Sequence, residues 1–276
     1  MLPNQVVPAP TTQQPQPLGV GPYTTVTGHA VMLTPQPAML IQNTVPGCPR
    51  GLEMMAKTGQ LIIQQKPPDS TLLEDILSEV TDFDKGLEAN KYSISTPSGQ
   101  TVYWAAEESG CCDRNCCGRG RSFRMRVVDS QHGEVLLLDR PLRCSCCCCF
   151  CCLQELEVSS GGVLLGTVTQ EFSVFYPSFS IRGPDGDVRL QITGPCWGCG
   201  CCSDIEFPVM SADGRRQVGN LTKRWNGIGR ELANDSKTFS VSFPDFADPA
   251  TRATLFGATI LLSYVFFEKD NIQQPS

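Results

Sequence analysis

The chain has 276 residues, a formal net charge of −6 and a pI near 5.0. This length can bury a full hydrophobic core without disulfide bonds, and the acidic balance excludes a surface devoted wholly to nucleic acid or anionic lipid. The opening residues 1–7 have neither the basic nor the apolar region of a secretory signal. We therefore expect the sixteen cysteines to be reduced thiols rather than a disulfide framework.

Residues 1–47 contain no Asp, Glu, Lys or Arg and are rich in Pro, Gln and Thr. Such a segment cannot bury enough apolar surface to fold, so it predicts a disordered, partly polyproline II tail. Proline-rich tails are docking surfaces for SH3 or WW modules, although the nine prolines here form no PxxP or PPxY motif. The two interpretations, partner docking and a solvated leader, both remain open.

Charge and pattern change at Pro49-Arg50-Gly51, where we place the start of a folded domain over 51–268, followed by a polar tail over 269–276. A short amphipathic helix is predicted around 71–80, because Thr71 and Glu74 have capping-box spacing and apolar residues recur at helical intervals. Its polar face is acidic, which favours a helix that covers one end of a core over one that lies on a membrane.

From residue 91 to residue 243 the apolar residues alternate with polar ones at a period of two, as in Phe123, Met125 and Val127. Turn signals separate these segments, for example Gly183-Pro184-Asp185-Gly186. About ten to twelve strands without intervening long helices predict an antiparallel barrel or sandwich. Closure into a barrel is favoured because it removes exposed strand edges.

An uncharged stretch of fifteen residues, 253–267, lies between Arg252 and Glu268. A membrane span needs about twenty apolar residues, whereas runs of about ten to fourteen are more often buried core helices. We favour a helix threaded into the barrel, where Gly257 and Ser263 would allow close packing, over a single bilayer span. The apolar residues of this helix are Ala253, Leu255, Phe256, Ile260, Leu261, Leu262, Tyr264, Val265, Phe266 and Phe267.

Seven cysteines fall within nine consecutive residues, 144–152. Adjacent cysteines cannot all face one core or one metal ion, so this run indicates exposed thiols available for acylation. A buried cysteine-rich strand or a zinc site is the alternative. Zinc could also be held by Cys111-Cys112 with Cys116-Cys117, or by the group from Cys196 to Cys202, as an all-thiolate site.

Several short blocks over about residues 51–268 together form a distinctive pattern. They include Gly51-Leu52-Glu53, Ala105-Ala106-Glu107-Glu108, Cys111-Cys112, Arg114-Asn115-Cys116-Cys117-Gly118, Arg140-Pro141-Leu142-Arg143-Cys144, Cys151-Cys152-Leu153-Gln154-Glu155, Gly194-Pro195-Cys196, Arg230-Glu231 and Phe266-Phe267-Glu268. In order and spacing, these blocks resemble the phospholipid scramblases. The resemblance implies a twelve-stranded, Tubby-like antiparallel barrel around a hydrophobic C-terminal helix. That helix is usually described as a single-pass membrane segment in the family.

The resemblance also implies palmitoylation, a position on the cytoplasmic face of a membrane such as the plasma membrane, and calcium-stimulated movement of phospholipids between leaflets without ATP. The cysteines that match the family's palmitoylation site are Cys146, Cys147, Cys148, Cys149, Cys151 and Cys152. One acyl chain gives only marginal binding, so several adjacent thiols would supply the second hydrophobic signal that stable anchoring needs.

Calcium is where the chain departs from the family pattern. Aligned from Asp235, the proposed EF-hand-like loop has Lys237 at its third position and Phe246 at its twelfth, where the family has aspartates. Asp245 and Asp248 could compensate after a local shift. The alternation of apolar residues over 239–243 predicts a barrel strand instead, so calcium binding at Asp235 stays a hypothesis.

Two functions compete at this point. The first is a membrane-anchored lipid scramblase, and the second is an acylated module that binds lipid headgroups or proteins without transport. An enzyme is not indicated, because the chain has no GxSxG, no HExxH and no phosphate-binding glycine loop, and it has only two histidines.

Overall fold

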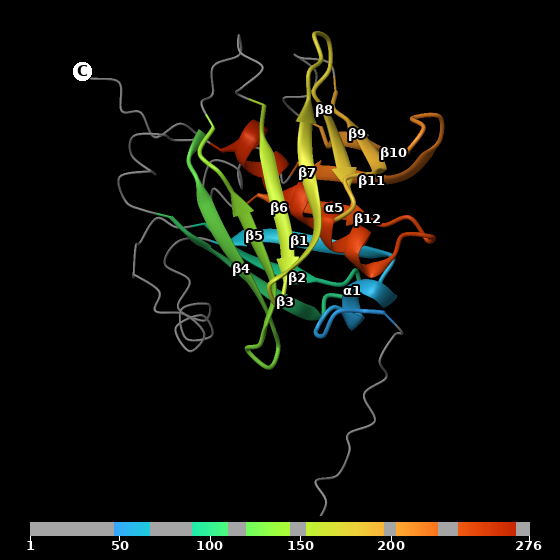
Figure 1. The fold of residues 1–276 in the computed structure, drawn as a ribbon. Coiled ribbons are helices and arrows are strands. Elements are labelled where there is room, and N and C mark those ends of the chain that lie inside the picture. Colours follow the sequence, from blue (N-terminus) through green and yellow to red (C-terminus); the bar gives the residue numbers. More distant parts are fainter. Residues whose placement is uncertain are drawn as a thin grey trace, which may run out of the picture. The chain divides into compact units, whose positions relative to one another are not determined.

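Twelve antiparallel strands close into a barrel in the computed structural model, which describes residues 47–66, 90–109, 120–143, 153–195, 203–225 and 237–268 (Figure 1). Each strand pairs with its neighbours in sequence, and β1 closes the barrel against β12. The predicted closed antiparallel barrel is confirmed. The predicted helix over 71–80 and nearly all of the predicted tail lie outside the described residues.

The strands are short, and in strands such as β4 the inward residues are those that the period of two predicted. Their bounds are β1 Gln60–Lys66, β2 Lys91–Ser95, β3 Thr101–Glu108, β4 Phe123–Asp129, β5 Glu134–Arg140, β6 Glu155–Ser160, β7 Val163–Glu171, β8 Ser178–Arg182, β9 Val188–Thr193, β10 Ile205–Ser211, β11 Gln217–Arg224 and β12 Thr238–Ser242. In β4, for example, Phe123, Met125 and Val127 are buried. A one-turn helix, α1 (Glu53–Lys57), precedes β1.

The two ends of the barrel differ in how the strands are joined. At one end, five tight connections join β2 to β3, β4 to β5, β6 to β7, β8 to β9 and β10 to β11; we call this the turn end. At the other end the connections are longer, and they join β1 to β2, β3 to β4, β5 to β6, β7 to β8, β9 to β10 and β11 to β12; we call this the loop end. The short connections therefore all lie at one end of the barrel and the longer ones at the other.

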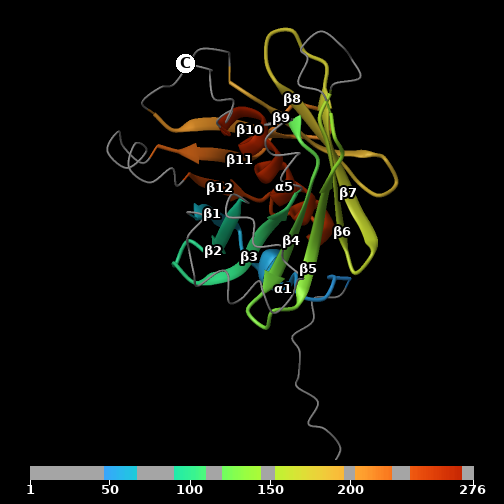
Figure 2. The same ribbon diagram turned by 90° about the vertical axis from the view of Figure 1, so that its left-hand side faces the viewer.

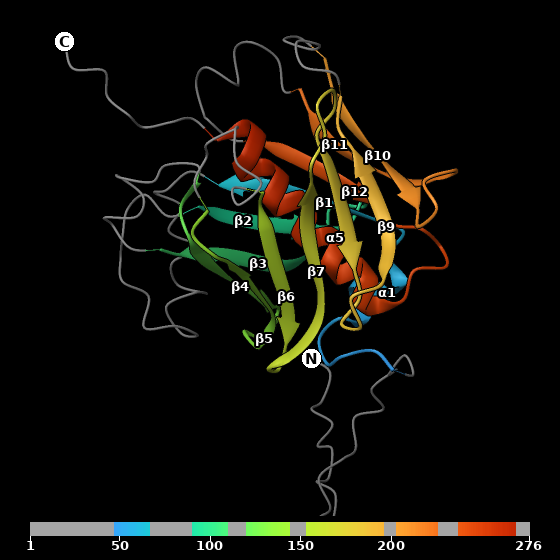
Figure 3. The same cartoon turned by 45° about the horizontal axis from the view of Figure 1, so that its top comes forward.

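The C-terminal helix lies inside the barrel. Helix α5 (Pro249–Leu262) continues as the short π-helical segment η3 (Ser263–Phe267), and strands surround α5 on opposite sides in Figures 2 and 3. Every residue over 251–264 is buried. Among the described residues this is the one helix long and apolar enough to cross a membrane, but 78% of its most apolar window is buried within the protein.

The helix begins four residues before the predicted start at Ala253. Asp248 is the N-cap, because its side chain accepts a hydrogen bond from the Thr251 amide at 2.8 Å, and Pro249 occupies the first turn. Arg252, which marked the boundary in the sequence, is instead buried within the helix. In a hydrophobicity pattern a charged residue marks the end of a buried helix. Here the helix continues through Arg252, because backbone carbonyl oxygens accept hydrogen bonds from its guanidinium.

Small residues let the helix approach the strands closely, as predicted for Gly257. A Cβ atom at Gly257 would lie 2.7 Å from Val158 Cγ2 and 3.2 Å from Leu156 Cδ2, so no larger side chain fits without movement. The hydroxyls of Thr259 and Ser263 donate to backbone carbonyls of the same helix, which satisfies them inside an apolar core.

Candidate functional site

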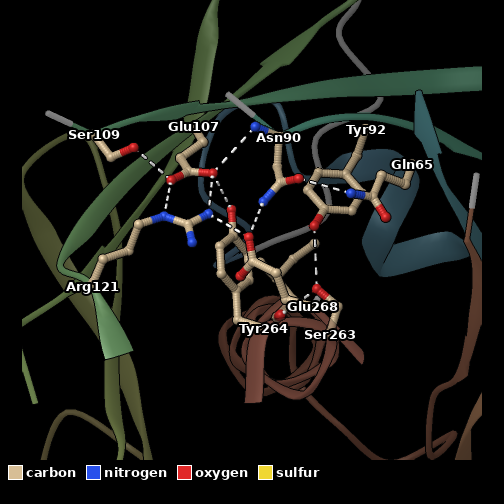
Figure 4. Close-up of polar contacts among 10 residues, drawn as sticks. Gln65, Asn90, Tyr92, Glu107, Ser109, Arg121, Ser263, Tyr264 and Glu268 are labelled. Carbon is tan, nitrogen blue, oxygen red and sulfur yellow. Dashed lines mark hydrogen bonds and ion pairs between the residues drawn. The ribbon is translucent and has the colours of Figure 1, made fainter. Parts of the chain in front are cut away.

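A buried polar cluster closes the loop end of the barrel around the last turn of the helix (Figure 4). Its members come from the strand ends at the loop end, from the residues next to them and from the C-terminal end of the helix. We call the following residues the polar cluster: Gln65, Asn90, Tyr92, Glu107, Ser109, Arg121, Ser263, Tyr264 and Glu268. It is the most extensive set of buried polar contacts among the residues that the structure describes.

An ion pair between Glu107 and Arg121 is at the centre of the polar cluster. Arg121 Nε lies 2.7 Å from Glu107 Oε1 and Arg121 Nη2 lies 3.0 Å from Oε2, while the two side chains are 4% and 0% exposed. Burial alone would raise the pKa of Glu107, but the hydrogen bonds and charge of Arg121 outweigh it, so this pKa is lowered. Both partners are therefore charged at neutral pH, in a bidentate geometry that compensates for desolvation.

The same ion pair ties the helix to the barrel. The Tyr264 hydroxyl donates to Glu107 Oε2 at 2.7 Å, and Arg121 Nη2 donates to Glu268 Oε1 at 2.7 Å. Asn90 Nδ2 also donates to Glu268, at 3.3 Å. Burial raises the pKa of Glu268, although Arg121 opposes that effect. These bonds hold the C-terminal turn of the helix against β2, β3 and the residues before β4.

A narrow recess lies beside the polar cluster. It is lined by Gln65, Asn90, Tyr92, Lys237, Ser263, Tyr264 and Glu268. Its empty volume is about 160 Å³, which includes space open to solvent. Within it, the hydroxyls of Tyr92 and Ser263 lie 3.2 Å apart, and burial raises the pKa of Tyr92. This recess cannot enclose a phospholipid.

A second buried cation, Arg140, lies next to the polar cluster at the end of β5. Its Nη2 donates to Gln154, and its guanidinium lies 5.6 Å from the ring centroid of Phe123 and 5.9 Å from that of Tyr264. Its Nε and Nη1 have no hydrogen-bond partner among the residues that the structure describes. Burial lowers the pKa of Arg140 to about 10, so it still carries its charge at neutral pH. Stacking on aromatic rings partly offsets the missing hydrogen bonds.

The opposite end of the helix is fixed by Arg252. Its Nη1 donates to the carbonyl oxygens of Met55, Ala56 and Thr58 at 3.3, 3.1 and 3.0 Å, and its Nη2 donates to that of Pro244 at 3.2 Å. One arginine thus joins the first turn of α5 to α1 and to the residues after β12. The helix is held at both ends by buried arginines, Arg121 at the loop end and Arg252 at the turn end.

Sequence reasoning did not assign a role to the polar cluster. In the sequence, Glu107 and the neighbouring Arg140 stood out only as parts of the blocks that resemble a family. One signal was available, because the period of two puts Glu107 on the inward face of β3 together with Ala105 and Tyr103. A charged residue at an inward position requires a buried partner, but the sequence does not say that Arg121 is that partner.

The predicted acylation sites, Cys146 to Cys149, Cys151 and Cys152, lie outside the described residues, as do Asp235 and the cysteine groups proposed for zinc. The strand order nevertheless fixes which connections hold them. Fifteen of the sixteen cysteines fall in the connections from β3 to β4, β5 to β6 and β9 to β10, all of which begin and end at the loop end. Cys48, before α1, is the exception.

Calcium binding stays a prediction, because Asp235 lies outside the described residues, which resume at Lys237. Phe239 and Val241 belong to β12 and face the core, as does Phe243 just after it. Asp248 Oδ1 and Oδ2 accept hydrogen bonds from the amide and hydroxyl of Thr251, so this carboxylate caps α5. Across the described ranges, no group of three or more His, Cys, Asp or Glu residues could hold a metal ion.

Together these features define a class of protein: a closed twelve-stranded antiparallel barrel filled by its own C-terminal helix and sealed by a buried ion-pair cluster. The family described as Scramblase matches residues 39–269. The chain belongs to the Scramblase family.

Curated relatives agree with this assignment over most of the chain. Phospholipid scramblase 2 of Bos taurus is 40% identical over 244 residues, which are 88% of this chain and 80% of the relative. Phospholipid scramblase 1 of Homo sapiens is 38% identical over 88% of this chain and 71% of its own length. Phospholipid scramblase family member 5 of Homo sapiens is 34% identical over 80% of this chain and 78% of its own. No solved structure matches the chain.

Proposed function

We propose that this chain is a membrane-anchored phospholipid scramblase that moves phospholipids in both directions between bilayer leaflets without ATP. The observation that carries the proposal is the likeness to proteins named phospholipid scramblases, at 38–40% identity over 88% of the chain. Such movement needs no covalent chemistry. The buried titratable groups fit that view, because Glu107 and Arg121 are engaged in holding the helix rather than facing an open cavity.

The anchor in this proposal is thioester-linked palmitate on Cys146, Cys147, Cys148, Cys149, Cys151 and Cys152. Each buried methylene contributes about 0.8 kcal/mol, and a single chain binds only reversibly, so two or more chains would hold the protein stably. We place it on the cytoplasmic face of the plasma membrane, with the loop end toward the lipid. The grouping of cysteines in connections of the loop end supports this orientation.

Stimulation by calcium is a further part of this proposal, and the experiment below tests it by comparing lipid movement with and without calcium. Asp248 caps α5, so a response to calcium would need other ligands, of which Asp235 is the candidate. Zinc bound by the cysteine groups and SH3 or WW proteins bound by the proline-rich tail are further parts of the proposal.

A second function is favoured by one observation: the barrel interior is occupied by its own helix. A filled barrel offers no path for a lipid through its centre. The chain could therefore act as a palmitoylated module that binds lipid headgroups or proteins without transporting them. If it does transport lipid, the headgroup must travel along the outside of the barrel or through a bilayer that the protein perturbs.

Lipid flipping in sealed liposomes separates the two functions. Purified, acylated full-length protein is reconstituted with fluorescent lipid, and access of a membrane-impermeant quencher is measured with and without calcium. Quenching that rises above the ~50% expected of an outer leaflet supports the scramblase, and its calcium dependence is read in the same experiment. Quenching that stays at the level of protein-free liposomes in both arms, with an intact fold, favours the binding module.

A further inference from the structure

Five consecutive residues of the connection between β7 and β8 are exposed, and four of them are apolar or aromatic. The segment is Phe172-Ser173-Val174-Phe175-Tyr176, in which Val174 is 70% and Phe175 is 73% exposed. It contains no charged residue. Loop tips of soluble proteins are ordinarily polar, and clustered exposed apolar groups mark interaction sites. We call residues 172–176 the aromatic loop; Figure 1 shows it in yellow beyond the ends of β7 and β8.

The base of the aromatic loop is held by specific contacts. Glu171 pairs with Ser178 across the two strands, and its carboxylate accepts hydrogen bonds from Ser180 at 2.6 Å and Arg182 at 2.9 Å. Pro177 is buried, and its carbonyl accepts the Gly194 amide at 2.7 Å. The exposed apolar side chains are therefore presented from a fixed base, which limits the entropy lost when they bind.

The aromatic loop is attached to the same part of the barrel as the cysteine run. Gln170, two residues before Phe172, donates its amide to the Gln154 carbonyl at 2.8 Å, and the Gln154 amide donates to Gln170 Oε1 at 3.1 Å. Gln154 follows Cys152 by two residues in sequence. One hydrogen-bonded pair of residues on β7 and just before β6 thus joins the start of the aromatic loop to the end of the cysteine run.

We propose that the aromatic loop inserts into the interfacial region of a phospholipid bilayer and acts as the second membrane signal beside the acylated cysteines. Phe and Tyr side chains suit that depth, where an apolar ring and a polar hydroxyl can both be satisfied. Because the loop carries no charge, its binding does not require anionic lipid. The inference rests on the membrane attachment in the proposed function and adds the residues that contact the lipid.

Exposed apolar residues at the turn end provide the comparison. Phe246 is 63% exposed in the segment between β12 and α5, and Val163 and Leu164 are exposed at the start of β7. They lie at the opposite end of the strands from the connection that holds the cysteine run. We choose the aromatic loop because it lies at the same end of the barrel as the cysteine run. Phe246 is also exposed but lies at the opposite end, so it is the control.

The test is flotation of the acylated full-length protein with phosphatidylcholine vesicles, comparing a Val174→Ser/Phe175→Ser variant with Phe246→Ser. Losing two apolar side chains from the interface should weaken partitioning by about tenfold or more, because the apolar surface that they would bury in the bilayer is lost. Phe246→Ser should bind like the parent protein. All three proteins should unfold at the same temperature, because the changed side chains are exposed.

Depth is measured independently with Phe175→Trp and Phe246→Trp, which share the same three native tryptophans. Brominated lipid should quench the added fluorescence at position 175 and not at position 246. Equal quenching at both positions, or unchanged flotation of the double serine variant, would overturn the proposal. Flotation does not depend on lipid flipping. If the parent protein binds vesicles through the aromatic loop but moves no lipid, the scramblase proposal is wrong and the loop proposal stands. If it moves lipid but does not bind through the loop, only the loop proposal is wrong.

Discussion

Tyr264 in the last turn of the helix donates a 2.7 Å hydrogen bond to Glu107 of β3, a residue 157 positions earlier in the chain. This contact makes the position of the helix and the charge state of the barrel interdependent. Glu107 is ionised because Arg121 holds it, and the same carboxylate then orients the tyrosine. The helix is consequently fixed in the barrel by polar contacts as well as by apolar burial.

Removing the charge of Glu107 should destabilise the fold. In Glu107→Gln, Arg121 loses its fully buried counterion and keeps only the more exposed Glu268, and breaking a buried pair costs about 3–5 kcal/mol. Glu268→Gln is the matched control in the same cluster. It should cost less, because Glu268 is more exposed and its Oε2 has no partner within the described part of the chain. Chemical denaturation of both variants measures the difference, and equal losses would mean that the Glu107–Arg121 pair has no special weight.

The contribution of Glu107 should also depend on pH. Its pKa in the folded state lies below the ordinary value of 4.5, so the pair stabilises the fold above pH 4.5 and this contribution is lost as pH falls through the lowered value. The gap in unfolding free energy between the parent and Glu107→Gln should therefore shrink in acid. Denaturation curves at pH 7 and at pH values below 4.5 test this, and a gap that widened in acid would show the opposite sign of shift.

Enlarging Gly257 distinguishes a helix in the barrel from a helix in lipid. Gly257→Leu places a side chain where a Cβ alone meets Val158 at 2.7 Å, and such overpacking costs about 1–3 kcal/mol or more. A lipid-exposed helix would accept leucine at this position. Gly59→Leu is the control, because no atom lies within 4 Å of a Cβ there. Thermal unfolding that was unaffected by Gly257→Leu would argue against the buried position.

Removing the helix cap should weaken the fold without changing any dependence of lipid movement on calcium. Asp248→Ala removes the side-chain acceptor of the Thr251 amide and should cost about 1 kcal/mol, whereas Asp248→Asn retains an acceptor and should cost little. If calcium stimulates lipid movement, Asp248→Asn should leave its calcium dependence unchanged. A shift of the calcium midpoint in this variant would mean that Asp248 is a ligand after all.

Replacing the six candidate cysteines, Cys146, Cys147, Cys148, Cys149, Cys151 and Cys152, with serine should release the protein from membranes. The expected change follows from the loss of acyl chains, because the helix is buried and cannot anchor the protein while it fills the barrel. Cys48→Ser, before α1, is the control and should remain bound. Membrane fractions washed at alkaline pH and probed for the protein give the readout.

Strand periodicity predicted an antiparallel barrel or sandwich, because alternating residues such as Phe123, Met125 and Val127 report which face of each strand is inside. Closure followed from the cost of exposed strand edges, and the number of twelve strands was implied by the family resemblance. The uncharged run over 253–267 predicted the core helix but not its start. Arg252 interrupts the hydrophobic pattern, and only the fold shows that carbonyls of Met55 and Thr58 satisfy it. A local sequence pattern predicts which residues are buried and whether they lie in a strand or a helix. It does not predict hydrogen bonds between residues that are distant in sequence, because those form only when the barrel closes.

The candidate site was harder to predict for the same reason. Glu268 lies 147 positions after Arg121, and no local pattern in the sequence indicates that it meets the Glu107–Arg121 pair. The aromatic loop was also missed, because Phe172 to Tyr176 reads as the continuation of an apolar strand until the structure shows that these residues are exposed. Exposure is a property of the folded chain, so composition alone could not separate this segment from the core.

The most direct test of the account asks on which side of a membrane the C-terminus lies. An epitope tag added after residue 276 is probed with protease in sealed vesicles that carry the acylated protein on their outer surface. A helix that fills the barrel keeps the tag on the same side as the barrel, so the account predicts that protease removes the tag without detergent. A tag that is protected until detergent is added would show that the helix crosses the bilayer, and would contradict the account.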